Sequence, residues 1–407
     1  MNLIAQSLDF LHLMPIFDPM KLNAPLLPLA VCLIIGIVLS SFLIDWTVML
    51  FWLAVAVVVV SLLSQWPRWQ TIGIWFCMVL LGMTMGARQQ PHPSRQTPNE
   101  TAMQMRQQMM ERYRQWGVSD EVLGVVTAMS LGEKSQLEWE LKDTYSKVGA
   151  AHILALSGLH LMIIYAFISL FIAWRRFRML SQIIIIVAIW AFAFLVGMSP
   201  SVVRSAFMIS IYALLSLGHR ERLSVNTLAL TAIVMLLFNP QSLYDISFQL
   251  SFMAVLAILL FYPLFCQVLP PHILQRHRWL NALWGMVTVS VSAQLGTAPL
   301  IAYYFGRFST YFLLSNFVVV PLATAVLYLT LASVLTGWWT GLQQLLVTIL
   351  SAVVILMNRL LQTISHLPYC TIEGLQPTGW QVAFLYLMIG SAYVLLSLRF
   401  ATTRQSV

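Results

Sequence analysis

The sequence predicts an all-α polytopic membrane protein, and three observations support this fold class. Of the 407 residues, 59% are hydrophobic and only 9% are charged, whereas an ordinary globular domain is nearer half apolar and a quarter charged. About twelve apolar stretches approach the roughly 20 residues that a helix needs to cross a bilayer. The longest segment between them, residues 88–149, is too short for a full-sized soluble domain. A soluble globular enzyme and a disordered chain are therefore excluded.

About 12 transmembrane helices are expected, in three regions of the chain. Residues 1–87 form an N-terminal transmembrane segment of about three helices, residues 88–149 an extracytoplasmic linker with amphipathic helices, and residues 150–407 the main transmembrane core. The expected spans are 24–44, 46–63, 71–87, 150–172, 179–197, 200–217, 223–238, 243–266, 279–305, 311–335, 341–362 and 379–398. The stretch that begins near Ala24 lacks a small-residue cleavage site, so we expect it to be retained as an anchor.

The distribution of lysine and arginine predicts the orientation of these spans. With a cytoplasmic N-terminus, the inner loops carry eleven cations and the short outer connections carry only three, Arg204, Arg307 and Arg359. This asymmetry is the one that the positive-inside rule expects, so both termini are predicted to be cytoplasmic. Eight further cations lie in residues 88–149, and translocated segments often escape the rule.

The segment between the third and fourth spans begins with a proline-rich linker at residues 91–98 and continues with two amphipathic patterns. The first is an apolar stripe at helical spacing, and the second is an apolar edge on a helix that we expect to lie on the outer surface. The stripe is Ala102, Met105, Met109, Tyr113 and Trp116, and the edge is Leu137, Leu141, Tyr145 and Val148. Arg106, Arg112 and Arg114 lie off the stripe; a solvated face is the favoured interpretation, and contact with phosphate is the alternative.

Polar side chains within the spans are costly unless they face protein or water, so each requires a reason. Most of them fall in the outer half of the predicted spans, with Gln294 just outward of mid-depth, His160 near mid-depth and Asn226 as an inner exception. The outer group is His152, Ser157, Arg204, Asp245, Gln249 and Asn316. Their shared depth predicts a wet vestibule that opens away from the cytoplasm.

Helix-interrupting residues favour a conduit over a plain membrane anchor. Ser199 and Pro200 begin a helix, so Arg204 follows a helix N-terminus, which favours an anion. Gln294, Gly296 and Pro299 are expected to interrupt the ninth span, and Asn316 with Pro321 the tenth, as in the broken helices that line substrate paths. Structural alternatives remain open. Arg204 and Asp245 would then form a buried ion pair, His152 and His160 would be core histidines, and Gly158, Gly296 and Pro321 would serve packing or kinking.

Two other functions are compatible with these residues. An intramembrane serine hydrolase would use Ser157 as the nucleophile and His160 or His152 as the base, although residues three apart on one helix seldom reach the geometry that activates serine. A small-solute secondary transporter is favoured by broken helices, but no inverted sequence repeat is visible. No CxxC or Cys/His spacing predicts a metal site, and no cofactor is expected.

From about residue 120 the chain resembles the ComEC family of competence proteins, which are membrane channels for DNA uptake. The resemblance covers residues 120 to 335 and is most specific in the run His152-Ile-Leu-Ala-Leu-Ser157-Gly158-Leu-His160. The other matching motifs are Ala128 to Lys134, Ser201-Val-Val-Arg204-Ser-Ala-Phe-Met208, Asn239-Pro240, Leu243-Tyr-Asp245-Ile-Ser-Phe248-Gln249-Leu-Ser251-Phe252, Gln294 with Pro299, and Asn316 with Pro321.

The resemblance implies a pore in the bacterial inner membrane that passes single-stranded DNA inward during natural transformation, rather than an enzyme. Relatives usually carry an OB-fold domain, for which residues 88–118 are too few, and many end in a nuclease domain, whose His-x-His-x-Asp-His run is missing. We therefore expect a pore-only form that is embedded in lipid and compatible with a homo-oligomer. It would depend on a separate DNA receptor, a nuclease and a cytoplasmic ATPase motor.

Overall fold

A computed structural model of the protein describes residues 24–41, 46–62, 65–88, 100–172, 178–217, 225–270, 274 and 276–405. The proline-rich linker at 91–98 and five of the cations that predict the orientation lie outside the described residues; these cations are Lys21, Arg175, Arg176, Arg220 and Arg222. In chain order the described elements are α2 (Leu26–Ser40), α3 (Trp46–Leu62), α4 (Pro67–Arg88), α5 (Glu100–Gln115), α6 (Asp120–Leu131), α7 (Trp139–Lys147), α8 (Ala151–Leu154), α9 (Gly158–Ile172), α10 (Arg178–Leu195), α11 (Pro200–Leu217), α12 (Val225–Phe238), η3 (Pro240–Tyr244), α13 (Ile246–Cys266), α15 (Arg278–Phe305), β1 (Arg307–Ser309), α16 (Phe312–Leu335), α17 (Thr340–Ser365), β2 (Thr371–Glu373) and α18 (Gly379–Gln405).

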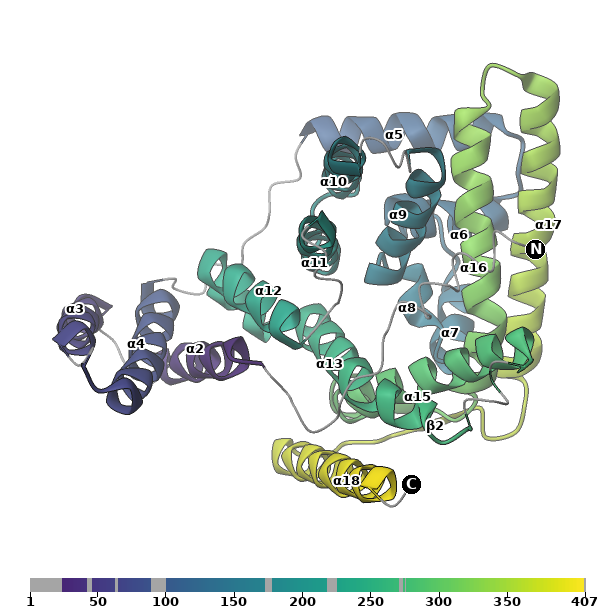
Figure 1. Ribbon diagram of the computed structural model, residues 1–407. Coiled ribbons are helices and arrows are strands. Elements are labelled where there is room, and N and C mark those ends of the chain that lie inside the picture. The colour runs from purple at the N-terminus through teal and green to yellow at the C-terminus, as the bar shows by residue number, and fades with distance from the viewer. Residues whose placement is uncertain are drawn as a thin grey trace.

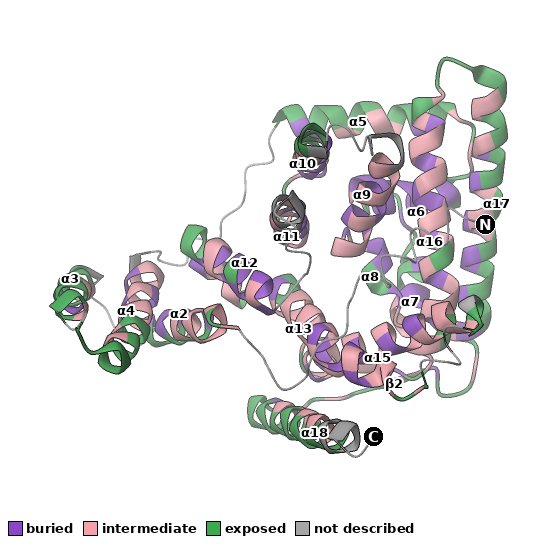
Figure 2. Cartoon of the chain, in the orientation of Figure 1, coloured by how far each residue is buried: buried purple, intermediate pink, exposed green. Residues whose placement is uncertain are grey.

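The all-α polytopic membrane fold is confirmed, because an apolar helix coincides with each of the predicted spans within the described part of the chain. Six helices, α4, α13, α15, α16, α17 and α18, are long and apolar enough to cross a membrane, and α2, α3, α9, α10, α11 and α12 contain shorter apolar stretches. In Figure 1, α2, α3 and α4 form a group at one side and α18 lies below α13 and α15. Figure 2 shows that α3 and α18 are mostly exposed, as expected for lipid-facing helices.

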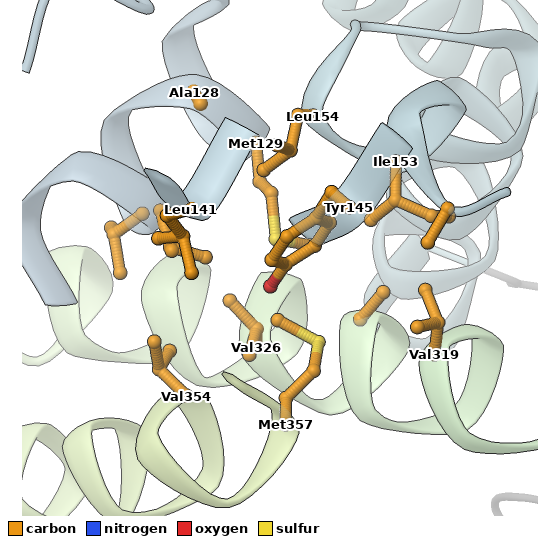
Figure 3. Close-up of a cluster of buried hydrophobic side chains, with 14 of the residues drawn as sticks. Ala128, Met129, Leu141, Tyr145, Ile153, Leu154, Val319, Val326, Val354 and Met357 are labelled. Carbon is orange, nitrogen blue, oxygen red and sulfur yellow. The ribbon is translucent and has the colours of Figure 1, made fainter. Parts of the chain in front are cut away.

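The largest hydrophobic core lies where the segment of residues 120–154 packs against the hairpin of α16 and α17. Figure 3 shows the Tyr145 ring of α7 among Met129, Ile153 and Met357, with Val326 nearby on α16. Helices α5 and α7 have the one-sided burial that the sequence predicts, although Met105 of the predicted stripe is exposed. No buried face is predicted for α6, yet every residue of this helix from Val122 to Leu131 is buried.

The predicted interruptions of the ninth and tenth spans are wrong. Helix α15 continues through Gly296 and Pro299, and α16 continues through Asn316 and Pro321. A proline inside a helix removes one backbone hydrogen bond, but apolar helices tolerate this loss where neighbouring helices pack against them. Close packing is present at Gly296, because a Cβ atom there would overlap the carbonyl oxygen of Met253 in α13.

The break instead lies in the fourth span, which the sequence predicts to be continuous over 150–172. The four-residue helix α8 ends at Leu154, and Ala155 has an extended backbone with φ −101° and ψ 130°. The helix resumes as α9 at Gly158. The motif that contains His152, Ser157 and His160 therefore surrounds a helix break.

Two connections between helices pair with each other at one end of the core. The α15–α16 and α17–α18 connections contain the antiparallel strands β1 and β2, with Phe308 opposite Ile372. The Arg307 guanidinium of β1 lies 3.3 Å from the Asp143 carboxylate of α7, and the Lys147 ammonium lies 2.7 Å from the same carboxylate. The hydrogen bond from Lys147, together with Arg307, holds the pKa of Asp143 below its usual range against the opposite effect of burial. The Arg307 contact fastens α7 to β1, and the strand pairing joins β1 to β2.

Candidate functional site

Arg204 of α11 is a buried cation, and its side chain is only 1% exposed. Its guanidinium donates to the Ser247 carbonyl of α13 at 3.2 Å and to the Ser201 hydroxyl at 3.0 Å, and it lies 5.5 Å from the centre of the Phe252 ring. Among the described residues no ion pair joins Arg204 to Asp245. Arg204 therefore neither lines an open vestibule nor forms the alternative ion pair with Asp245. It fastens α11 to the first turn of α13.

Asp245 begins α13 and caps it. One carboxylate oxygen accepts from the amides of Ser247 at 2.7 Å and Phe248 at 3.3 Å, which are orphan donors at a helix N-terminus. The negative charge also offsets the positive end of the helix dipole. The short helix η3 precedes it, so the predicted eighth span begins at residue 246 rather than at 243.

Gln249 lies one turn into α13 and connects it to α15. Its amide donates to the Leu243 carbonyl at 2.9 Å, and its side-chain oxygen accepts from the Tyr304 hydroxyl at 2.7 Å. Gln294 and Asn316 are half-buried, and no hydrogen bond among the described residues joins either of them to this network. The buried Asn316 Oδ1 has no partner among the described residues.

Ser157 and His160 meet at the helix break. The Nδ1 atom of His160 lies 3.0 Å from the Ser157 hydroxyl oxygen and accepts the Ser157 amide at 3.3 Å. This is the arrangement of a capping box, in which the side chain three residues into a helix accepts the amide of its N-cap residue. His152 lies across the break on α8 and is exposed, with Nδ1 3.1 Å from the Gly149 carbonyl.

The N-terminal turns of α9, α11 and α13 lie next to one another. A Cβ atom on Gly158 would lie 2.8 Å from the Ser205 hydroxyl, so the start of α9 packs directly on the first turns of α11. The neighbouring Arg204 contacts the first turn of α13 through Ser247. Three motifs that are far apart in the sequence are thus brought together, and with them His160, Arg204 and Asp245.

The three arginines of α5 have different environments. The Arg106 guanidinium packs against Gly197 in the connection between α10 and α11, with 3.3 Å from its Nη2 to the position that a Cβ would take. Arg112 and Arg114 are exposed, and Arg114 lies 3.7 Å from Glu111. Only Arg112 and Arg114 are thus free to contact a large anionic ligand from this helix.

Sequence reasoning missed two polar residues that connect helices. The Asn358 side chain of α17 is 1% exposed; it accepts from the Tyr145 hydroxyl at 2.7 Å and donates to the Glu121 carboxylate at 2.6 Å. It therefore joins α6 and α7 to α17. The signal was present, because Asn358 is an amide inside a predicted span. The other is Tyr304 of α15, whose hydroxyl donates to Gln249 of α13.

Comparison with known proteins places these motifs in a family. Residues 129–399, about two thirds of the chain, match the family model described as "Competence protein". The chain is 34% identical over 204 residues to "ComE operon protein 3" of Bacillus subtilis (strain 168), an alignment that covers 49% of this chain and 25% of that protein.

Two further relatives are uncharacterised proteins. One, from Aquifex aeolicus (strain VF5), is 30% identical over 198 residues, which is 48% of this chain and 44% of the relative. YcaI of Escherichia coli (strain K12) is 25% identical over 217 residues, which is 50% of this chain and 27% of that protein. The alignments thus span from a quarter to under half of the length of these relatives. No solved structure matches the chain.

Proposed function

The chain belongs to the competence protein family, and on that premise we propose that it forms a membrane conduit through which single-stranded DNA passes inward during natural transformation. The conduit lies in the bacterial inner membrane with both termini in the cytoplasm. In this proposal, strand degradation and inward pulling fall to separate proteins. A DNA receptor, a nuclease and a cytoplasmic ATPase are the partners that this division requires.

The observation that carries the proposal is the meeting of three family motifs at the N-terminal turns of α9, α11 and α13. Helix N-termini favour anions, so three of them next to one another suit the passage of a phosphate backbone. Arg204 fastens the site, whereas Asp245, Gln249 and Gln294 are half-buried and are the candidates for its wall. Arg112 and Arg114 on α5 are candidates for phosphate contact outside the bundle.

The contacts of the interhelical connections support the part of the predicted topology that places three segments on one side of the membrane. Helix α7 and the strands β1 and β2 come from three segments that the positive-inside rule places outside. The Arg307–Asp143 contact and the strand pairing bring these three segments to the same end of the molecule. A topology that placed these segments on opposite faces of the membrane would separate groups that are in contact.

The proposal is tested by deleting the gene and restoring it with single variants while the uptake of labelled DNA and the number of transformants are measured. Arg204→Ala removes three hydrogen bonds of a buried cation, so we expect transformation to fall on the order of tenfold or more. Asp245→Ala should lower it as well, because α13 loses its cap.

Asp245→Asn is the matched variant, since asparagine caps a helix as well as aspartate but carries no charge. If the carboxylate lines the DNA path, Asp245→Asn transforms differently from the wild type even though the cap remains. Immunoblots of the membrane fraction control for the amount of protein. Wild-type transformation by both alanine variants, at wild-type amounts of protein, would contradict the proposal.

The 3.0 Å contact between Ser157 and His160 is the one observation that favours an intramembrane hydrolase. The same Nδ1 atom also accepts the Ser157 amide, and the other ring nitrogen has no partner in the described structure. A catalytic base is normally oriented by a third group through that second nitrogen. The contact is accordingly better explained as a helix cap.

A further inference from the structure

The N-terminus of α9 presents hydrogen-bond donors that have no acceptor. The amides of Gly158 and Leu159 are the first two of the helix, and neither meets an acceptor among the described residues. Both residues are half-buried, so they are neither fully solvated nor covered by protein. The first amides of a helix are the donors that bind anions in many proteins, because the positive end of the helix dipole adds to their effect.

His160 adds a third donor, since contacts of its Nδ1 atom with Ser157 hold its ring at the first turn of the same helix. Its Nδ1 atom accepts from the Ser157 amide, so the neutral ring carries its proton on Nε2. The residue is 1% exposed, and the buried Nε2 atom has no hydrogen-bond partner. The carbonyl of Ile153 lies near the ring but not in hydrogen-bonding geometry with it. A buried donor without an acceptor costs free energy, which a ligand oxygen at this position would recover.

The positive end of the α9 dipole also has no carboxylate of its own. The equivalent end of α13 has its own carboxylate in Asp245, whereas the N-cap residue of α9 is the neutral Ser157. Arg204 sits buried on the neighbouring first turn of α11, next to Ser205, and no acidic side chain forms an ion pair with it in the described structure. One helix end and one buried guanidinium therefore produce positive potential that the protein only partly neutralises.

We propose that the break before α9 binds a phosphodiester group of the transported strand through the amides of Gly158 and Leu159 and through Nε2 of His160. The inference rests on the proposed function, since it names the part of the substrate that this site holds. Half-helices that point their N-termini at the anionic group of a substrate are a recurring device in membrane transporters. The glycine at position 158 keeps the first turn free of a side chain, so that α11 and a ligand can both approach its backbone.

The test compares His160→Glu with His160→Gln in the purified full-length protein in lipid nanodiscs. Both replacements can accept the Ser157 amide as a capping-box residue does, so the start of α9 is retained in both. Only glutamate places a negative charge where the phosphate would bind. With a fluorescein-labelled oligothymidylate as the probe, we expect His160→Glu to weaken binding about tenfold more than His160→Gln does. Equal affinities for the two variants, both as well folded as the wild type, would overturn the proposal.

Measurements on the wild-type protein test the site without any substitution. The methylphosphonate analogue of the oligothymidylate has the same bases but a neutral backbone, so it should bind much more weakly, and binding of the charged strand should weaken as salt is raised. Competition by inorganic phosphate, or by phosphatidylglycerol in place of phosphatidylcholine, shows whether a free anion or a lipid headgroup occupies the site instead. Equal binding of the two oligonucleotides would overturn the proposal.

The failure of this inference can be distinguished from failure of the proposed function. If cells take up DNA normally but the two His160 variants bind the probe equally, the conduit stands and the phosphate site does not. If the binding difference is found but the wild-type gene does not restore DNA uptake, the anion site stands and the transport proposal fails.

Discussion

Helix α15 and the α8–α9 pair depart in opposite directions from what their sequences predict. Helix α15 contains a glycine and a proline three residues apart and remains continuous over 28 residues. The α8–α9 stretch contains no proline, yet it is interrupted between Leu154 and Gly158. At Gly296 the backbone of α13 presses against α15, whereas at the break the Ser157 cap and the His160 ring replace the helical hydrogen bonds. The comparison teaches that tertiary contacts decide where an apolar helix ends.

The largest expected effect comes from Gly296→Val. The new side chain would overlap the Met253 carbonyl and the Ala257 side chain, so α13 and α15 must separate, at a cost of about 3 kcal/mol. A large drop in the unfolding temperature of the detergent-solubilised protein is the expected result. Gly390→Val on α18 is the matched control, because nothing lies within 4 Å of a Cβ atom there. An equal fall in unfolding temperature for both substitutions would show that the contact between α13 and α15 does not stabilise the protein.

Ser157→Ala should have an intermediate effect. The substitution removes the hydroxyl of the N-cap residue, so we expect a loss of about 1 kcal/mol in stability and a partial loss of DNA uptake. Ser169→Ala in the same helix is the control, since that hydroxyl only donates to the Ala166 carbonyl within its own helix. Complete loss of function in Ser157→Ala at unchanged stability would favour the hydrolase interpretation over a cap.

Pro299→Ala should have the smallest effect. The alanine restores one backbone donor to α15 but removes part of a buried ring, so the two contributions nearly cancel and stability should change by less than about 1 kcal/mol. The unfolding temperature measures the difference. A stabilisation of several kcal/mol would show that the proline strains α15 and that the neighbouring helices do not compensate for it.

The positions of the apolar helices could be predicted because hydropathy adds up along the chain and depends little on neighbours. The break could not, since it depends on the contact of Gly158 with Ser205 on another helix and on the ring of His160. Gly296, Pro299 and Pro321 misled the prediction because the analogy with broken transporter helices does not include the neighbouring helices, which here compensate for these residues. Asn358 was visible in the sequence, but its partners Glu121 and Tyr145 belong to distant segments.

For the candidate site, residue types could be predicted better than their roles. The cost of polar groups in lipid pointed to Arg204, Asp245 and Gln249, and the structure connects all three to the start of α13. That Arg204 would be covered could not be predicted, because the Ser247 carbonyl that it binds is 43 residues away in the sequence. Whether the wall residues contact DNA stays a prediction that the variants above address.

The pairing of β1 with β2 limits how the last four helices can move. Because the α15–α16 and α17–α18 connections are joined by backbone hydrogen bonds, these helices are tied at that end. Because the short connection of residues 336–339 joins α16 to α17 at the opposite end, any widening there must lie between α15 and α18 and must taper toward the strands. An opening made in this way would be wedge-shaped, and it would close again without the strands ever parting.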